Sequence, residues 1–128
     1  MIVKNGVDVV NVSRIKGVFE RFGERFVQKI LHEEEINLFH VVNNKPRYLA
    51  KRFSAKESVA KAFGFGIGKI LSFHDIIVRH DEFGAPFVVV PDCKWPALKV
   101  GRYTRHSISL SISDDEELVV SSVVIVMF

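Results

Sequence analysis

The chain has 128 residues, of which 48% are hydrophobic, so we expect a single globular domain over residues 1–128 with a sizeable core. Its net charge of +3 suits an acidic partner or a phosphate-rich ligand and does not by itself indicate nucleic-acid binding. The single cysteine, Cys93, excludes an internal disulfide. The sequence shows neither a secretory signal pattern nor an apolar run near the ~20 residues that span a bilayer. We therefore expect a cytoplasmic protein that does not cross a membrane.

The N-terminal stretch Ile2–Val10 is rich in β-branched residues and is predicted to form a strand. Asp8 lies inside this apolar run, where an unpaired carboxylate is costly. It therefore needs a cation, a hydrogen-bond network or access to solvent. From the residues alone two interpretations stay open: Asp8 is functional, or it merely begins a turn toward Asn11.

A first helix is predicted from about Arg14 to Arg21, capped by Asn11 or Ser13. Its apolar residues recur at steps of three and four and form one stripe: Ile15, Val18, Phe19 and Phe22. Four basic residues lie off that stripe: Arg14, Lys16, Arg21 and Arg25. Such residues usually form a solvated face, although an excess of one charge also suits an acidic partner.

Further helices are predicted in the middle of the chain. Gly23 is expected to break the first helix, and the acidic residues after His32 are typical of a helix start, because the helix dipole favours acids there. Pro46 is expected at the first position of a long central helix. On that helix Glu57 and Lys61 are one turn apart. They form either a solvated ion pair worth ~0.2–0.5 kcal/mol or an edge that serves a metal ion and a phosphate.

Glycines at every second position follow this helix, at Gly64, Gly66 and Gly68. Because glycine lacks a Cβ atom, such a series allows the backbone to approach a ligand closely. It is equally typical of a helix C-cap with a flexible exit. The residues alone leave both interpretations open.

After the glycines the pattern changes from helix to strand. Phe73–His80 and Pro86–Val90 are predicted to pair as a hairpin around the turn 81–84. Residues 91–96 are expected to be irregular, and residues 97–103 fit a short helix or a loop equally well.

The C-terminal part is predicted to be a second hairpin. Ser107–Ser113 alternates strictly between serine and apolar residues, which indicates a strand with one apolar and one serine face. Asp114–Glu117 is expected to form the turn, and Leu118–Val126 the last strand. The order of elements predicts an α+β fold with a largely antiparallel sheet packed against the long central helix.

Three motifs follow one another along the chain. The first is Gly6-Val7-Asp8-Val9-Val10, and the second runs from Arg52-Phe53-Ser54-Ala55-Lys56-Glu57 to Gly64-Phe65-Gly66-Ile67-Gly68. The third is Leu71-Ser72-Phe73-His74-Asp75-Ile76 followed by Asp81-Glu82-Phe83-Gly84-Ala85-Pro86. In their order and spacing they resemble the motifs of holo-[acyl-carrier-protein] synthases, the small trimeric 4′-phosphopantetheinyl transferases. The resemblance covers about residues 1–86 and resumes weakly at the C-terminus.

This resemblance implies an enzyme that transfers 4′-phosphopantetheine from coenzyme A to a serine of apo-acyl carrier protein, for fatty acid biosynthesis. The products are holo-acyl carrier protein and 3′,5′-ADP. The resemblance further implies dependence on Mg²⁺, a homotrimer with active sites between subunits, and a 4′-phosphopantetheinyl transferase-like fold. The general base, the range of carrier proteins and the affinity for coenzyme A are not assigned.

The family's site residues fall on particular positions of this chain. Asp8 and Glu57 match the two metal-binding acids, and with Lys61 they form the implied catalytic set. A metal ion and Lys61 would neutralise charge on the diphosphate of coenzyme A. Six positions are expected to hold the coenzyme: Arg52, Lys56, Lys61, Gly64, Gly66 and Gly68. Three are expected to bind the acidic carrier: Arg14, Arg21 and Arg25.

One part of the family pattern is missing. Two histidines that are common near the first strand of the last hairpin fall here on Ser109 and Asp114, when the chains are aligned through Val123-Val124-Ile125. A shift of register would place His106 at the first position and would still leave the second without a histidine. The resemblance therefore leaves open what replaces the contacts of these histidines with the coenzyme near Ser109 and Asp114.

Other chemistries have little support in the sequence. The five histidines are scattered without metal-ligand spacing, and Cys93 has no base beside it in the sequence. An RNA-binding module would explain the basic charge and the phenylalanines, but no RNP-like aromatic run or GxxG loop between helices occurs. A non-catalytic assembly protein would explain the apolar excess and would leave the glycine series without a role.

Overall fold

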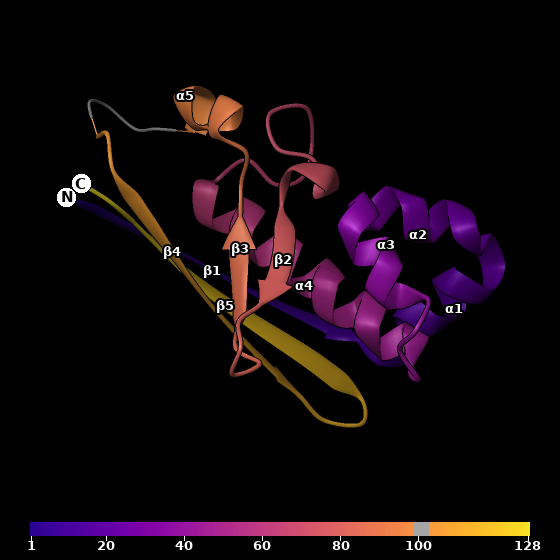
Figure 1. Cartoon of the computed structure of the whole chain (residues 1–128). Coiled ribbons are helices and arrows are strands. Elements are labelled where there is room, and N and C mark those ends of the chain that lie inside the picture. Colours follow the sequence, from indigo (N-terminus) through magenta and orange to yellow (C-terminus); the bar gives the residue numbers. More distant parts are fainter. Residues whose placement is uncertain (99–102) are drawn as a thin grey trace.

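The computed structural model describes residues 1–98 and 103–128. Its strands and helices follow in the order β1 (Ile2–Asn11), α1 (Val12–Phe22), α2 (Glu24–Ile30), α3 (Glu33–Phe39), α4 (Lys45–Phe63), β2 (Ile77–His80), β3 (Pro86–Val89), α5 (Trp95–Leu98), β4 (His106–Asp114) and β5 (Leu118–Met127). The predicted α+β fold is confirmed. Figure 1 shows α4 in the middle of the molecule, with α1, α2 and α3 grouped at one end.

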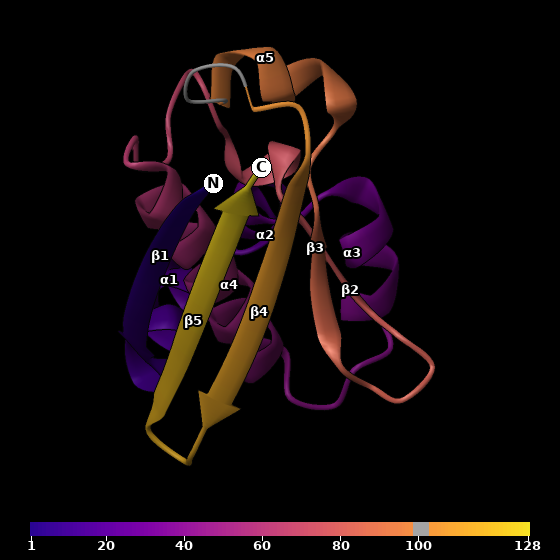
Figure 2. The same ribbon diagram turned by 90° about the vertical axis from the view of Figure 1, so that its left-hand side faces the viewer.

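The main sheet contains three antiparallel strands in the order β1-β5-β4, so the first and last strands of the chain are neighbours. Figure 2 shows this sheet from its open side, with α4 behind it. In the register of β1 and β5, Asp8 lies opposite Ser121. Strands β2 and β3 form a separate two-stranded antiparallel sheet. All strand pairs in the described residues are therefore antiparallel, as the sequence predicts.

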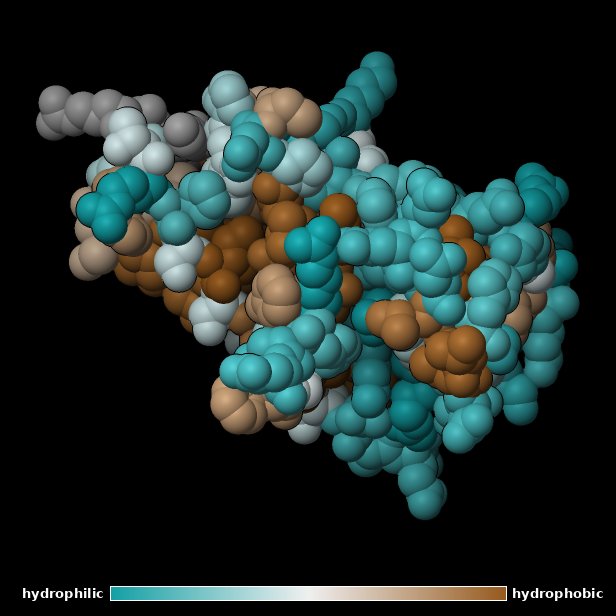
Figure 3. Space-filling model, in the orientation of Figure 1, coloured by the Kyte–Doolittle hydropathy of each residue, from teal (hydrophilic) through white to brown (hydrophobic). Residues whose placement is uncertain are grey.

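The two faces of the main sheet differ in composition. Gly6, Asp8 and Val10 of β1 are buried, while the residues between them are exposed. On β4 the serines are exposed and the apolar residues between them are half-buried, which confirms the predicted serine face. Figure 3 shows hydrophilic side chains over most of the helical end, whereas hydrophobic ones gather over the strands.

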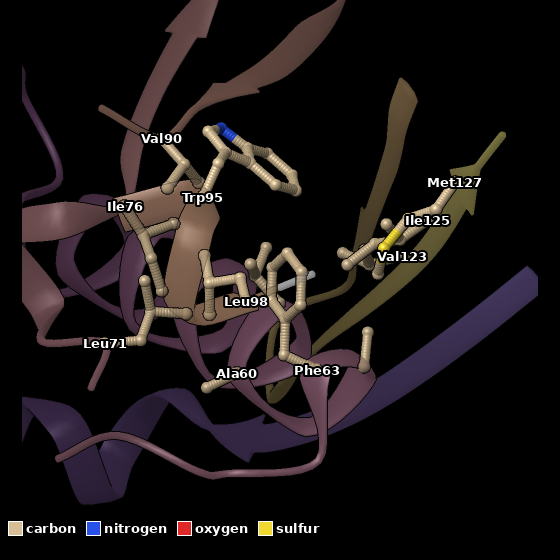
Figure 4. Close-up of a cluster of buried hydrophobic side chains, with 12 residues drawn as sticks. Ala60, Phe63, Leu71, Ile76, Val90, Trp95, Leu98, Val123, Ile125 and Met127 are labelled. Atoms are coloured by element: carbon tan, nitrogen blue, oxygen red, sulfur yellow. The ribbon is translucent and has the colours of Figure 1, made fainter. Parts of the chain in front are cut away.

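The core consists of two clusters of buried apolar side chains. One lies between the end of α4, α5 and β5, where the rings of Phe63 and Trp95 meet edge to face with centroids 5.6 Å apart (Figure 4). The other lies under α1, α2 and α3 and includes Leu49, a buried residue of α4. Helix α4 contributes to both clusters, so its position is set along most of its length.

The structure confirms the Asn11 cap and the break at Gly23, and it differs from the prediction at the start of α4. Asn11 caps α1, and its side chain accepts a hydrogen bond from the Ser13 amide at 2.9 Å. Gly23 separates α1 from α2 with a φ of 56°, a left-handed value that glycine adopts readily. His32 caps α3. Pro46 takes the second helical position of α4, because Lys45 precedes it and Asn44 is the cap.

The structure differs from the sequence-based prediction at the start of β2 and settles part of the stretch 97–103. The strand predicted from Phe73 begins only at Ile77, because Asp75 accepts hydrogen bonds from the Ser72 amide and hydroxyl and closes a 3₁₀ turn over Phe73–Asp75. The undecided stretch 97–103 belongs to α5 as far as Leu98, and residues 99–102 lie outside the described residues. In the part of the chain that the structure describes, no helix has the length and apolar composition to cross a membrane.

Candidate active site

Two residues of the predicted catalytic set meet where β1 lies against α4. Asp8 is 8% exposed on the inner face of β1. The Nζ atom of Lys61 donates a hydrogen bond to Oδ1 of Asp8 at 2.9 Å and another to the carbonyl oxygen of Val7 at 3.2 Å. The sequence pattern cannot show this contact, because it depends on how the sheet packs against the helix.

Glu57 completes this acidic cluster, which we define as Asp8, Glu57 and Lys61. It is half-buried and lies one turn before Lys61 on α4. Burial raises the pKa of Glu57, and the carboxylate of Asp8 raises it further, while Lys61 and Arg14 act in the opposite direction. Two neighbouring carboxylates whose negative charges repel each other are typical of a cation-binding site.

The donor set of this cluster fits Mg²⁺. Oδ2 of Asp8 is buried and has no hydrogen-bond partner among the residues that the structure describes, which is costly for a carboxylate oxygen. Within residues 1–98 and 103–128, no group of three or more His, Cys, Asp or Glu side chains is arranged to hold a metal ion. Mg²⁺ commonly uses one or two carboxylates with waters and substrate phosphates, so Asp8 and Glu57 suffice as protein ligands.

Arg52 lies on a different side of α4. It is nine residues before Lys61, about two and a half turns, so the two side chains point in opposite directions. Its guanidinium stacks over the ring of Tyr48 at 4.1 Å and borders a cavity of about 390 Å³. The cationic residues Arg47 and Lys51 and the side chain of His80 also line this cavity. We call it the Arg52 cavity.

Lys56 is not brought to either place, because its side chain enters the core. It is 0% exposed, and its Nζ atom donates to Oε1 of Glu35 at 2.5 Å and to the carbonyl oxygens of Ile30 at 2.7 Å and Phe73 at 3.1 Å. An ammonium group has three N–H donors, and all three are used. The structure therefore offers no donor of Lys56 to a coenzyme, in contrast to the sequence-based expectation.

Glu35 is the residue of this region that the sequence analysis missed. Its carboxylate is 1% exposed, and besides Lys56 it pairs with Nε of Arg52 at 3.4 Å and accepts a hydrogen bond from the Val78 amide at 3.1 Å. It thereby joins α3, α4 and β2. Because Glu35 sits in a run of three acids, nothing in the sequence singles it out as the buried one.

The first glycine of the series, Gly64, is the C-cap of α4, one of the two roles that the sequence left open. Gly64 ends α4 with a φ of 89°, and its amide donates to the carbonyl oxygens of Ala60 and Lys61. The amides of Gly66 and Gly68 also donate to carbonyl oxygens of the protein. A Cβ atom at any of the three would meet no described atom within 4 Å, so this segment leaves open space beside the end of the helix.

Ser109 and Asp114, which stand where the family commonly has histidines, have different surroundings in the structure. Ser109 is exposed on the outer face of β4, opposite Val124. Asp114 forms ion pairs with Nη1 of Arg47 at 2.7 Å and with Nζ of Lys51 at 3.6 Å, and so ties the end of β4 to α4. His106 does not replace Ser109. It is three residues away on the strand and therefore faces the other side, where it stacks on Trp95 with ring centroids 3.4 Å apart.

The predicted carrier-binding residues lie together on one surface. Arg14 and Arg21 are exposed on α1, and Arg25 is exposed on α2. Beside them is a cavity of about 310 Å³, which the sequence analysis did not predict. Its lining combines apolar and basic side chains: Val18, Phe22, Arg25, Phe26 and Lys29. Of these residues, Arg14 is near enough to the acidic cluster for its charge to lower the pKa of Glu57.

Comparison with known proteins decides the family. Residues 5–118 match the sequence model of the 4′-phosphopantetheinyl transferase superfamily. This chain belongs to that superfamily.

Curated relatives agree with this assignment. The chain is 35% identical over 125 residues to a holo-[acyl-carrier-protein] synthase of Vibrio cholerae, with 98% of each chain covered. It is 43% identical over 113 residues to the synthase of Sulfurovum sp., covering 88% of this chain and 87% of the relative. The resemblance inferred from the three motifs is therefore confirmed, and the superfamily consists of transferases.

Solved structures agree as well. The holo-[acyl-carrier-protein] synthase of Neisseria meningitidis has a TM-score of 0.86 at 38% identity, covering 95% of this chain and 96% of that one. The Bacillus anthracis synthase, solved in complex with CoA (3′,5′-ADP), has a TM-score of 0.82 at 35% identity, with 98% of this chain and 96% of that chain covered. These superfamily members share the fold over nearly the whole length of both chains.

Proposed function

We propose that this transferase moves 4′-phosphopantetheine from coenzyme A to a serine hydroxyl of apo-acyl carrier protein in a Mg²⁺-dependent reaction. The observation that carries the proposal is the acidic cluster, in which Asp8, Glu57 and Lys61 come together in a member of the superfamily. Its synthase relatives are named for the carrier, and a related structure was solved in complex with coenzyme A. We assign the reaction to fatty acid biosynthesis in the cytoplasm.

The reaction forms a bond between the serine oxygen and the β-phosphorus of coenzyme A and breaks the bond from that phosphorus to the bridging oxygen. 3′,5′-ADP leaves with the bridging oxygen, and the serine proton must be accepted by a base. Lys61 is half-exposed, so its ammonium can reach a diphosphate and stabilise the charge that develops on the leaving oxygen. Asp8 and Glu57 would hold Mg²⁺, which when bound supplies further positive charge at the diphosphate.

The nucleotide end of coenzyme A is assigned to the Arg52 cavity. Arg47, Lys51 and Arg52 supply positive charge around this cavity. Burial, followed by the charges of Arg52 and Lys51, lowers the pKa of His80 at the same cavity. Since Arg52 and Lys61 point in opposite directions from α4, one coenzyme bound by both is best shared by two subunits. We therefore propose that the diphosphate binds at the acidic cluster of one subunit and the nucleotide at the Arg52 cavity of the next.

A shared site requires an oligomer, and the outer face of the main sheet suits one. Exposed apolar side chains from two neighbouring strands cover this face: Val3, Val7 and Val9 on β1, and Leu118, Val120 and Val124 on β5. A contiguous exposed apolar face of this kind marks an interaction surface. We propose a homotrimer in which these outer faces pack together, a heterologous arrangement that closes into a ring. We call this surface the outer sheet face.

The carrier is assigned to the surface of α1 and α2. Acyl carrier proteins are acidic, and Arg14, Arg21 and Arg25 supply exposed positive charge there. The adjoining 310 Å³ cavity provides apolar contact area between Phe22 and Phe26. Complementary charge guides encounter and fixes orientation, while the apolar cavity supplies contact that salt does not screen. The carrier serine would then approach Glu57 from the side of Arg14.

The direct test is mass spectrometry of apo-acyl carrier protein incubated with this protein, coenzyme A and Mg²⁺. We expect the carrier mass to rise by one phosphopantetheine group and 3′,5′-ADP to accumulate in equal amount. Omission of Mg²⁺, or addition of a chelator, is expected to prevent the shift. A carrier mass that stays unchanged with all components present would contradict the proposed function.

A further inference from the structure

Gly6 lies closer to helix α4 than any other residue type could. A Cβ atom at this position would be 2.1 Å from the carbonyl oxygen of Ser58 and 2.8 Å from the amide nitrogen of Ala62. Both are backbone atoms of α4, so no side-chain rotation relieves the contact. A side chain at position 6 therefore requires β1 and α4 to move apart.

The two backbone atoms that Gly6 approaches belong to the neighbours of the catalytic side chains. Ser58 follows Glu57 in the chain, and Ala62 follows Lys61. On the strand, Gly6 and Asp8 are two residues apart and share the inner face. This close approach of β1 to α4 therefore lies beside the acidic cluster.

The contacts of Lys61 depend on this short separation. Its Nζ atom reaches the main chain of β1 at Val7 and the side chain of Asp8, at 3.2 Å and 2.9 Å. If β1 moved away from α4, Asp8 would move with it, while Glu57 and Lys61 would stay with the helix. The two carboxylates would then no longer face one site.

We propose that Gly6 is a positioning residue: its missing side chain sets the β1–α4 separation at which Asp8 and Glu57 bind one divalent cation. This inference rests on the proposed function, which assigns that cation to these two acids. According to this proposal, Gly6 affects the affinity for the cation separately from its effect on the stability of the fold.

The test measures the affinity of the folded protein for Mn²⁺ alone, as a paramagnetic substitute for Mg²⁺, by electron paramagnetic resonance. Gly6→Ala is made in the Gly17→Ala background, because position 17 is within a helix and has open space around it, so alanine there favours folding. We expect Gly6→Ala to weaken Mn²⁺ binding by about ten-fold or more relative to Gly17→Ala alone.

Two controls separate positioning from general loss of stability. Val27→Ala removes buried apolar volume in α2, outside the β1–α4 contact, and is expected to lower the melting temperature while leaving Mn²⁺ affinity within about two-fold. Asp8→Glu lengthens the carboxylate by one methylene. Alone it should weaken Mn²⁺ binding, whereas combined with Gly6→Ala it should recover part of the lost affinity, because the longer side chain spans the wider gap.

Each result bears on the proposal. Weaker Mn²⁺ binding in Gly6→Ala with partial recovery by Asp8→Glu supports it. Unchanged affinity in a folded Gly6→Ala protein overturns it and leaves the proposed function intact. Failure of the Gly6→Ala protein to fold also overturns it, since Gly6 would then serve folding in general. If the unsubstituted protein binds no Mn²⁺, both the inference and the metal part of the proposed function are wrong.

Discussion

The ammonium of Lys61 lies 2.9 Å from Oδ1 of Asp8, although 53 residues separate them in the chain. This hydrogen bond uses one oxygen of Asp8 and leaves the buried Oδ2 without a partner among the described residues. The same lysine also opposes the rise in the pKa of Glu57. The positive charge of Lys61 therefore balances part of the negative charge of Asp8 and Glu57, and a divalent cation would balance the rest.

Removing either acid is expected to stop transfer without unfolding the protein. Asp8→Ala and Glu57→Ala should each lower the transfer rate at saturating substrates by at least about 10²-fold, because the charge that holds the cation is lost. Asp8→Ala also removes an unsatisfied buried oxygen, so its melting temperature without metal should not fall. Near-normal transfer by either variant in Mg²⁺ would show that its acid is not a ligand.

The stability of the metal-free protein should depend on pH through Glu57. Burial and Asp8 raise its pKa above the usual 4.5, so folding favours the protonated form. This contribution is fully present below the unfolded-state pKa and is lost as pH rises through the raised, folded-state pKa. Glu57→Gln should remove that part of the pH dependence. Urea unfolding from pH 4 to 7 measures it, and identical pH profiles for both proteins would contradict the prediction.

Two adjacent glutamates provide a matched test of the buried ion pairs. Glu35 pairs with Lys56 inside the core, whereas Glu34 pairs with Arg79 at the surface. Glu35→Ala should lower the free energy of unfolding by ~3–5 kcal/mol, because it leaves buried cations without a partner. Glu34→Ala should lower it by no more than ~1 kcal/mol. Equal losses in urea unfolding experiments would mean that Glu35 and Lys56 are not coupled as the structure indicates.

Charge reversal on α1 should weaken carrier binding selectively. Arg14→Glu and Arg21→Glu are expected to raise the Michaelis constant for acyl carrier protein several-fold and to change that for coenzyme A little. The effect should shrink at high salt, because exposed charges are screened over roughly 8–10 Å. Arg105→Glu, an exposed reversal outside α1 and α2, is the control. A carrier constant unaffected by both reversals would leave α1 as ordinary surface.

A charge on the outer sheet face should prevent assembly. Val124 is exposed on β5, the middle strand, so Val124→Asp places a carboxylate at the centre of the proposed interface. We expect the unsubstituted protein to sediment as a trimer and the variant as an inactive monomer. Ser113→Asp, near the end of β4, tests whether the edge of that face is equally sensitive. A fully active monomer of the unsubstituted protein would contradict a shared active site.

The sequence predicts the elements better than it predicts their contacts. Local rules place the Asn11 cap, the break at Gly23 and the serine face of β4, because each depends on neighbours in the chain. The position of Asp8 against Lys61 was accessible only through the family resemblance. No periodicity shows which face of α4 meets β1, or how closely.

The sequence did not predict which charged side chains of α4 point into the core. Arg52 and Lys56 carry positive charge and belong to the family motif, so the sequence suggests that both face a ligand. In the structure Glu35, from another helix, pairs with both of them, and only Arg52 also borders a cavity. A charged side chain enters a core only when such a partner exists, and the partner's identity is a property of the tertiary fold.

The sheet order β1-β5-β4 also has a consequence for folding during translation. Strand β1 is translated before the helices, whereas its neighbour in the sheet, β5 (Leu118–Met127), is translated after all the other described helices and strands. The backbone of β1 can pair fully only once β5 has been made, and contacts between such distant segments form slowly. The strand that carries Asp8 is therefore fixed only after α4, with Glu57 and Lys61, has been translated. A fragment that ends before β5 contains α4 but lacks the strand that holds Asp8 in place.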